Sequence, residues 1–136
     1  MFTALKSLYA QAKLAVKVGG RMGPALLSLT GLKQGCPLSP TLFGIYIGGL
    51  CRYLEHHCPD TGPILADGSR IPTLQYADDV TLVATTPDGL QRLQNWAVQF
   101  FKAIGLLLSP AKTFVMSFPA NSPSTLGHVM VSPCSV

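Results

Sequence analysis

Apolar residues recur at helical spacing in three segments of the chain, residues 3–12, 40–54 and 87–104. A spacing of three to four residues places these side chains on one face of a helix, where they can pack against a core. The segment 40–54 carries the widest apolar stripe and is predicted to form a long buried helix. The aromatic residues of the third segment are assigned to the core for the same reason.

Two pairs of residues mark where helices begin. Ser39 is a good N-cap with Pro40 at the first helical position, and Thr86 with Pro87 repeats this arrangement. Gly105 is expected to end the last helix, because glycine readily adopts the left-handed conformation that follows a helix.

Residues with strand character lie between the predicted helices. Residues 13–18 alternate as a strand does, Gly19 and Gly20 turn the chain, and a second strand near residues 25–29 completes a hairpin. The glycines and prolines of residues 30–40 exclude a regular element before the long helix begins.

A second hairpin is predicted from residues 70–76 and 80–85, joined tightly at residues 77–79. Residues 114–118 are predicted to be a further strand. Residues 119–136 mix Ser, Pro and Gly with short apolar pairs, so we expect a loop-like, poorly packed tail. Hairpins and helices in this order predict an α+β fold with an antiparallel sheet packed on helices.

The composition refines this picture. A chain of 136 residues has room for one hydrophobic core, so a single domain is expected. The chain is 48% hydrophobic and only 12% charged, and its mean hydropathy is +0.36, which suits an interior piece of a larger protein. Ten Lys and Arg against six Asp and Glu give a net charge of +4. This balance favours a polyanionic partner such as nucleic acid as much as it favours a merely basic surface.

Several protein classes do not fit the sequence. The longest uncharged central stretch, residues 34–51, is short and is interrupted by Pro37 and Pro40, so no membrane span is expected. The first residues lack the basic leader and apolar block of a signal peptide, so we expect an intracellular protein, nuclear or cytoplasmic, and not a secreted one. Four irregularly spaced cysteines without a CxxC pair argue against a disulfide framework or a zinc site.

Asp78 and Asp79 stand side by side where the second hairpin turns, between arms that are otherwise apolar. Bringing two carboxylates near a core is unfavourable unless a cation meets them, and a divalent metal ion is one such cation. Neighbouring strand residues point to opposite faces, so a two-metal site would need a third carboxylate from another strand. The alternative is an ordinary turn, in which Asp is common.

Three stretches resemble the motifs of reverse transcriptases, and the resemblance covers about residues 8–127. Residues 76–79, Tyr-Ala-Asp-Asp, resemble the YxDD box of that family, and residues 34–43 resemble its QGxPLSPxLF element. Residues 105–113 are similar to the family's G-L-x-L-N-x-x-K-T stretch, with Ser109 where Asn is usual. The sequences of these motifs are most similar to those of non-LTR retrotransposon and group II intron enzymes.

The resemblance implies a polymerase palm-like sheet and two-metal nucleotidyl transfer. It makes Asp78 a catalytic metal ligand and Asp79 an accessory catalytic carboxylate close to the primer end. The implied cofactor is Mg²⁺ or Mn²⁺, bound by Asp78 and Asp79. The implied partners of the full-length enzyme are an RNA template, a DNA primer and dNTPs.

The resemblance also assigns roles to five further residues. Tyr76 and Ala77 would shape the site, and Gln34 and Gly35 would lie beside the templating base and the incoming nucleotide. Lys112 would act near the triphosphate, where it offers charge or a proton to the leaving pyrophosphate. The alternative for Lys112 is a solvated loop lysine.

One part of the family's pattern is absent. The first palm strand of the family supplies an essential Asp upstream of the helix with which this chain begins, and this sequence has no acidic residue before Glu55. We therefore expect residues 1–118 to be a partial palm domain that lacks its first strand, fingers and thumb. The chain is then a fragment of a retroelement polyprotein with negligible polymerase activity on its own.

Two other functions stay open at this point. One is a non-enzymatic α+β module that binds nucleic acid; exposed aromatic residues on a sheet face would favour it, but the predicted strands carry few aromatic residues. The other is a retroelement relic without a present function, because a recent relic keeps its motifs.

Overall fold

The structure is a computed structural model that describes residues 2–10, 13–27, 31–32, 35–117, 127–131 and 133–134. It divides into two compact units, Met1–Ser39 and Pro40–Val136. We refer to them as the N-terminal unit and the C-terminal unit, and each is described by itself.

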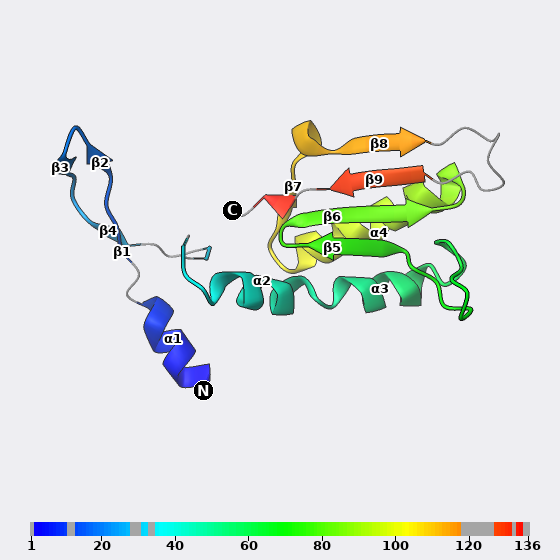
Figure 1. Cartoon of the computed structure of the whole chain (residues 1–136), viewed down its shortest axis with the longest axis horizontal. Helices are drawn as coiled ribbons and strands as arrows, with labels where there is room; N and C mark the ends of the chain where they lie inside the picture. The colour runs from blue at the N-terminus through cyan, green and yellow to red at the C-terminus, as the bar shows by residue number, and fades with distance from the viewer. Residues whose placement is uncertain are drawn as a thin grey trace. The chain divides into compact units, whose positions relative to one another are not determined.

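The N-terminal unit contains one helix and one hairpin (Figure 1). Helix α1, Phe2–Ala10, confirms the first predicted helix. The hairpin consists of four two-residue strands: β1, Lys13–Leu14; β2, Lys17–Val18; β3, Arg21–Met22; and β4, Leu26–Leu27. Strand β1 pairs with β4 and β2 pairs with β3, both antiparallel. Gly19 and Gly20 make the predicted turn with φ of +56° and +81°, which two glycines adopt without strain.

A bulge separates the two halves of this hairpin. Two residues lie between β1 and β2, whereas three lie between β3 and β4. The Gly23 amide still donates to the Val16 carbonyl oxygen over 2.8 Å, so the extra residue falls at Pro24 and Ala25. Proline has no amide hydrogen to give to the ladder, and a bulge is one of the few places in a ribbon that accept it.

The predicted long helix is two helices. Helix α2, Ser39–Ile47, begins where the sequence predicts, but it ends before Gly48 and Gly49, and α3, Leu50–His57, follows. Two consecutive glycines weaken a helix because glycine loses more backbone entropy than other residues when it becomes ordered. The expectation of one uninterrupted buried helix was therefore wrong.

The C-terminal unit is built on a four-stranded antiparallel sheet in the order β5-β6-β9-β8. These strands are β5, Thr73–Tyr76; β6, Asp79–Ala84; β8, Phe114–Ser117; and β9, Gly127–Val131. Helix α4, Pro87–Ala103, lies behind the sheet in Figure 1, and α2 and α3 run along its β5 edge. Strand β7, Leu107–Leu108, pairs with β10, Pro133–Cys134, and a short 3₁₀ helix, η1, Pro110–Lys112, leads into β8.

The core of this unit lies between the sheet and its helices. It includes Ile47, Leu50 and Leu54 from α2 and α3, Val80, Leu82 and Ala84 from β6, and Leu90, Leu93, Ala97 and Phe101 from α4. Trp96 and Phe100 pack against this cluster half-buried, so the assignment of the α4 aromatic residues to the core is confirmed.

Strand β9 corrects the expectation of a loop-like tail. Residues 127–131 pair with β6 on one side and with β8 on the other, so this part of the predicted tail sits inside the sheet. Residues 119–126 lie outside the described residues, and the division of the chain at residue 118 stays a prediction. Antiparallel strands packed on helices confirm the α+β class. No helix in the described part of the chain has the length and apolar character of a membrane span.

Candidate active site

The β5–β6 hairpin presents its two carboxylates at a two-residue turn. Tyr76 and Asp79 form the last pair of the ladder, so only Ala77 and Asp78 lie between the strands. Ala77 has a φ of +51°, in the left-handed region that residues with a Cβ atom rarely adopt. Such strain persists where the surrounding structure imposes it, and it is common at functional turns.

The register of the sheet decides which face each residue of the turn occupies. Val80 is buried in the core, so its neighbour Asp79 projects from the opposite side of the sheet. Paired residues of antiparallel strands share a face, which places Tyr76 beside Asp79, and Leu74 beside Thr81. We call this surface the open face; Tyr76 is 82% exposed there.

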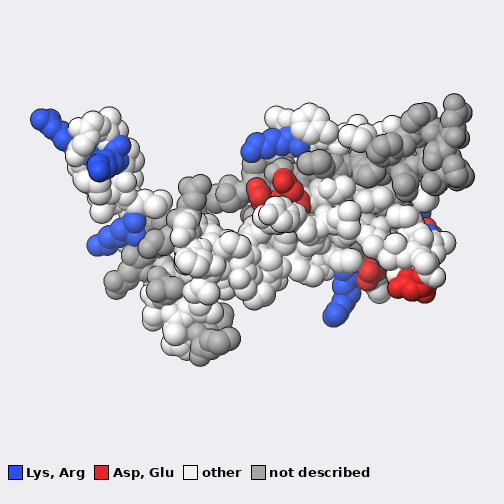
Figure 2. Space-filling view, in the orientation of Figure 1, with Lys and Arg blue, Asp and Glu red and all other residues white. Residues whose placement is uncertain are grey.

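Both carboxylates are accessible to solvent. Asp78 and Asp79 are exposed, and Figure 2 shows a group of acidic side chains over the β5–β6 turn with basic surface close by, near η1 and its Lys112. The turn therefore offers negative charge at the surface, next to a cationic segment, rather than a buried carboxylate pair.

Lys112 lies at the same end of the sheet as the carboxylates. Thr81 of β6 and Phe114 of β8 both pair with Met130 of β9, so β6 and β8 run in the same direction on either side of β9. Asp79 and Lys112 each precede that row by two residues. The backbones of Thr81 and Phe114 are separated by two strand spacings, on the order of 10 Å, and Lys112 lies in η1 shortly before Phe114.

The two other predicted nucleotide-binding residues, Gln34 and Gly35, do not belong to the C-terminal unit. Gly35 belongs to the N-terminal unit and has a φ of +81°, which suits a glycine in the turn before α2. Gln34 lies outside the described residues. The structure thus brings Tyr76, Ala77, Asp78, Asp79 and Lys112 to one end of one sheet.

The donor set at the turn fits a divalent cation that takes few protein ligands. Mg²⁺ is commonly held by one or two carboxylates together with phosphates and water, and Asp78 and Asp79 supply two exposed carboxylates. Within the described residues, however, no group of three or more Asp, Glu, His or Cys side chains converges on a possible metal position. The third carboxylate that the sequence led us to expect is therefore not found in this part of the chain.

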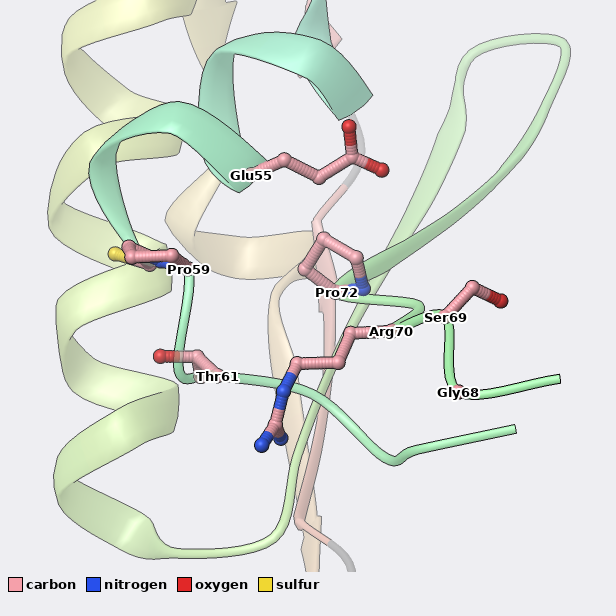
Figure 3. A pocket seen from close by; sticks show the side chains of 8 residues that line it. Glu55, Pro59, Thr61, Gly68, Ser69, Arg70 and Pro72 are labelled. Atoms are coloured by element: carbon pink, nitrogen blue, oxygen red, sulfur yellow. The ribbon is translucent and has the colours of Figure 1, made fainter. Parts of the chain in front are cut away.

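A separate pocket of about 410 Å³ lies at the opposite end of β5 (Figure 3). Its lining includes Glu55, Cys58, Thr61 and Arg70. Arg70 donates to the Gly62 carbonyl oxygen over 3.0 Å, which ties the pocket wall to its own loop. Strand β5 spans its four residues, about 13 Å, between this pocket and the turn. The pocket does not belong to the carboxylate site.

One contact near the QGxPLSPxLF element, residues 34–43, could not be predicted from the sequence. The Tyr9 hydroxyl, 27 residues away along the chain, donates to the Cys36 Sγ over 3.5 Å. This hydrogen bond, with further bonds from the Leu38 and Ser39 backbone, lowers the pKa of the Cys36 thiol below its ordinary value. No spacing in the sequence links the two residues.

The sequence of this chain is similar to that of known proteins. The family described as "Reverse transcriptase (RNA-dependent DNA polymerase)" matches residues 2–130. A Popillia japonica protein named "Retrovirus-related Pol polyprotein from type-1 retrotransposable element R2" is 31% identical over 97 residues, 71% of this chain and 16% of that protein. The Xenopus laevis "Transposon TX1 uncharacterized 149 kDa protein" is 36% identical over 92 residues, 67% of this chain and 7% of that protein.

A Drosophila melanogaster relative, "Retrovirus-related Pol polyprotein from type-2 retrotransposable element R2DM", is 35% identical over 87 residues, 63% of this chain and 8% of that protein. The chain thus spans less than a fifth of the length of these curated relatives. No solved structure is significantly similar to it.

Proposed function

This chain belongs to the reverse transcriptase family, and we propose that its β5–β6 turn is the metal-binding carboxylate element of an RNA-directed DNA polymerase. The reaction is nucleotidyl transfer from a dNTP to a DNA primer on an RNA template, performed by a longer protein of the retrotransposon type. The observation that carries the proposal is the exposed pair Asp78 and Asp79 at a strained turn, with Asp79 on the open face.

The architecture around the turn supports a palm-like role for the C-terminal unit. Four antiparallel strands carry helix α4 on one face, while Leu74, Tyr76 and Phe114 are exposed. Leu74 and Phe114 lie in the same row across β5, β6, β9 and β8. A sheet with one accessible face can support an extended ligand beside the carboxylates, which a sheet covered on both sides cannot.

The residues at the turn have distinct tasks in this proposal. Asp78 and Asp79 hold divalent ions, which, when bound, activate the attacking hydroxyl and neutralise the charge of the phosphates. Asp79 projects from the open face, so it can reach a primer end that lies there. Tyr76 flanks Asp79 on the same face and limits the space beside it.

Lys112 belongs to the proposed site, and the family resemblance adds Gln34 and Gly35 as nucleotide-binding residues. The Lys112 ammonium group stabilises negative charge on the leaving pyrophosphate from the edge of the sheet. The resemblance implies that Gly35, without a side chain, lets the nucleotide approach the backbone closely, and that Gln34 acts at the templating base.

We further propose that the isolated chain does not synthesise DNA. A two-metal reaction requires carboxylates that reach both ions, and the chain has only four other acidic residues, Glu55, Asp60, Asp67 and Asp88. Asp67 is engaged by its own loop, where it accepts hydrogen bonds from the Ser69 amide over 2.9 Å and the Ser69 hydroxyl over 2.6 Å. Primer extension with Mg²⁺ or Mn²⁺ tests this statement, and robust templated synthesis by the chain alone would contradict it.

The metal site is tested by titrating Mn²⁺ into the wild type and into Asp78→Asn under calorimetry. Loss of a group that only hydrogen-bonds to a metal ligand already weakens metal binding by about 10–100-fold, so removing a direct ligand is expected to weaken it at least tenfold. The matched control is Asp60→Asn, which removes one exposed carboxylate from the loop after α3. Circular dichroism establishes that all three proteins fold equally. Equal Mn²⁺ affinities for the three proteins would refute the proposed metal site.

A further inference from the structure

The charges of this chain are separated between its two units. Residues 1–39 contain Lys6, Lys13, Lys17, Arg21 and Lys33 and no acidic residue. All six Asp and Glu lie in residues 55–88, and the other five Lys and Arg lie in residues 52–112. The N-terminal unit therefore carries a net charge of +5 and the C-terminal unit −1, which together give the +4 of the chain. An average surface mixes both signs, so a unit with only one sign is typical of a polyanion-binding segment.

Three of these cations stand on the hairpin of residues 13–27, which we call the basic hairpin. Lys13 is on β1, Lys17 on β2 and Arg21 on β3, and all three are exposed. On the face that Figure 2 displays, basic side chains cover the hairpin and no acidic ones do. Lys13 and Lys17 are four residues apart, about 13 Å along an extended ribbon.

The apolar residues of the basic hairpin are exposed as well. Leu14, Val18, Met22 and Leu26 each leave more than half of their surface accessible. An isolated two-stranded ribbon is marginally stable in water, so this hairpin gains stability when a partner covers it. Because the hairpin carries three cations and no carboxylate, a partner that covers it should be negatively charged.

We propose that the basic hairpin binds the phosphate backbone of nucleic acid through Lys13, Lys17 and Arg21. This proposal rests on the proposed function, because it assigns a second contact surface for the same template and primer. The hairpin contains no Phe, Tyr, Trp or His, so it has no ring to stack on bases. It therefore positions the strand and carries little sequence information.

An anionic membrane is the other polyanionic surface that such a hairpin could meet. Hairpins and helices that lie at a membrane interface are enriched in Trp and Tyr, which anchor at the level of the headgroups. The basic hairpin lacks these residues, and the family of the chain acts on nucleic acid by its description. Nucleic acid is the occupant that these observations favour.

The test compares two double variants of the full chain that lose the same charges. Lys17→Gln/Arg21→Gln changes the hairpin, and Lys102→Gln/Arg52→Gln removes one exposed Lys and one exposed Arg from α4 and α3 of the C-terminal unit. Fluorescence anisotropy measures binding to a labelled single-stranded DNA of about 20 nucleotides, longer than common single-strand site sizes. The salt concentration runs from about 50 to 200 mM, and chelator is present so that no divalent ion contributes.

Each lost phosphate contact lowers the slope of log affinity against log salt by about 0.7 for a single strand. The hairpin variant is expected to lose about 1.4 from this slope, which corresponds to roughly 25-fold weaker binding at 0.1 M salt. The control variant should keep both its slope and its affinity. A mixed-sequence strand and a homopolymer should bind equally, because the contacts are to phosphate.

Three results would overturn the proposal. The first is an unchanged slope in the hairpin variant, and the second is an equal loss in the control variant, which would mean that only total charge matters. The third is hairpin-dependent binding to phosphatidylserine vesicles with no hairpin-dependent binding to DNA. The DNA titration contains chelator and the Mn²⁺ titration contains no DNA, so the basic-hairpin proposal and the proposed metal site can fail independently of each other.

Discussion

Ala77 adopts a backbone conformation that its side chain disfavours. Its φ of +51° lies in the left-handed region, which costs a residue with a Cβ atom roughly 1–2 kcal/mol. Ala77→Gly removes this penalty but increases the entropy of the unfolded chain, so a net stabilisation of about 0.5–1 kcal/mol is expected. The free energy of unfolding from urea denaturation measures it.

The matched control for this substitution is Ala66→Gly. Ala66 is an exposed turn residue that is not among the positive-φ residues of the described chain, so glycine there adds only unfolded-state entropy. This variant should be less stable than the wild type by about 0.4–1 kcal/mol. If both variants shift the unfolding free energy in the same direction, Ala77 stores no strain at the turn.

Cys36 is expected to react with thiol reagents at lower pH than an ordinary cysteine. The Tyr9 hydroxyl hydrogen bond lowers the pKa of Cys36, so its thiolate, the reactive form, is populated at a lower pH than in the unfolded chain. Tyr9→Phe removes the hydrogen bond, and the pH profile of iodoacetamide alkylation at Cys36 should move to higher pH. Mass spectrometry of the modified peptide measures the rate at each pH.

Cys58 provides the internal reference in the same sample. This cysteine is buried, and burial raises its pKa, so it should react slowly in the wild type and equally slowly in Tyr9→Phe. Superimposable Cys36 profiles for the two proteins would show that Tyr9 does not act on the thiol.

Alanine substitutions are expected to have opposite effects at two glycines near the break between α2 and α3. Gly44 lies within α2, and a Cβ atom added there would meet nothing within 4 Å, so Gly44→Ala should stabilise the protein by about 0.5–1 kcal/mol. At Gly48 an added Cβ would lie 2.8 Å from the Gly44 carbonyl oxygen, and Gly48→Ala should be destabilising. Urea denaturation of the two variants tests the pair, and a stabilising Gly48→Ala would mean that the break is not held by this contact.

Elements with local signals could be predicted from the sequence, and elements without them could not. Thr86 caps helix α4, because its Oγ1 accepts a hydrogen bond from the Gly89 amide over 3.1 Å. Gly105, with a φ of +76°, follows the other end of the helix. The break before α3 was missed because the apolar stripe continues across it through Ile47 and Leu50, both buried. Strand β9 was missed because its partners, β6 and β8, lie elsewhere in the sequence.

The residues of the candidate site could likewise be predicted only where a local sequence signal marks them. Tyr76, Ala77, Asp78 and Asp79 are contiguous, so the sequence places them together whatever the fold is. Lys112 joins them at one end of the sheet only through the register of β6, β9 and β8, and no local pattern encodes that register. A carboxylate pair can therefore be recognised in a sequence more readily than the cation that accompanies it.

The chain as a whole places its apolar core in one unit and its excess positive charge in the other. The core cluster comes from residues 47–106, whereas the N-terminal unit holds five cations, no acidic residue and a hairpin with exposed apolar side chains. Hydrophobic burial is the main driving force of folding, so the stability of the chain should reside in the C-terminal unit. The basic hairpin is then free to adapt to a ligand without loss of the core.

A pair of leucine substitutions tests this division. Leu93 on α4 is fully buried, so Leu93→Ala removes core contacts and should lower the free energy of unfolding by about 2–5 kcal/mol. Leu26 in the hairpin is 64% exposed, so Leu26→Ala should change it by less than about 0.5 kcal/mol. Trp96, the one tryptophan of the sequence, packs against the core, and its fluorescence in urea reports the transition of the C-terminal unit. If Leu26→Ala shifts that transition as far as Leu93→Ala does, the hairpin and the core unfold as one cooperative body, and adaptation of the hairpin to nucleic acid would strain the sheet that carries the proposed metal site.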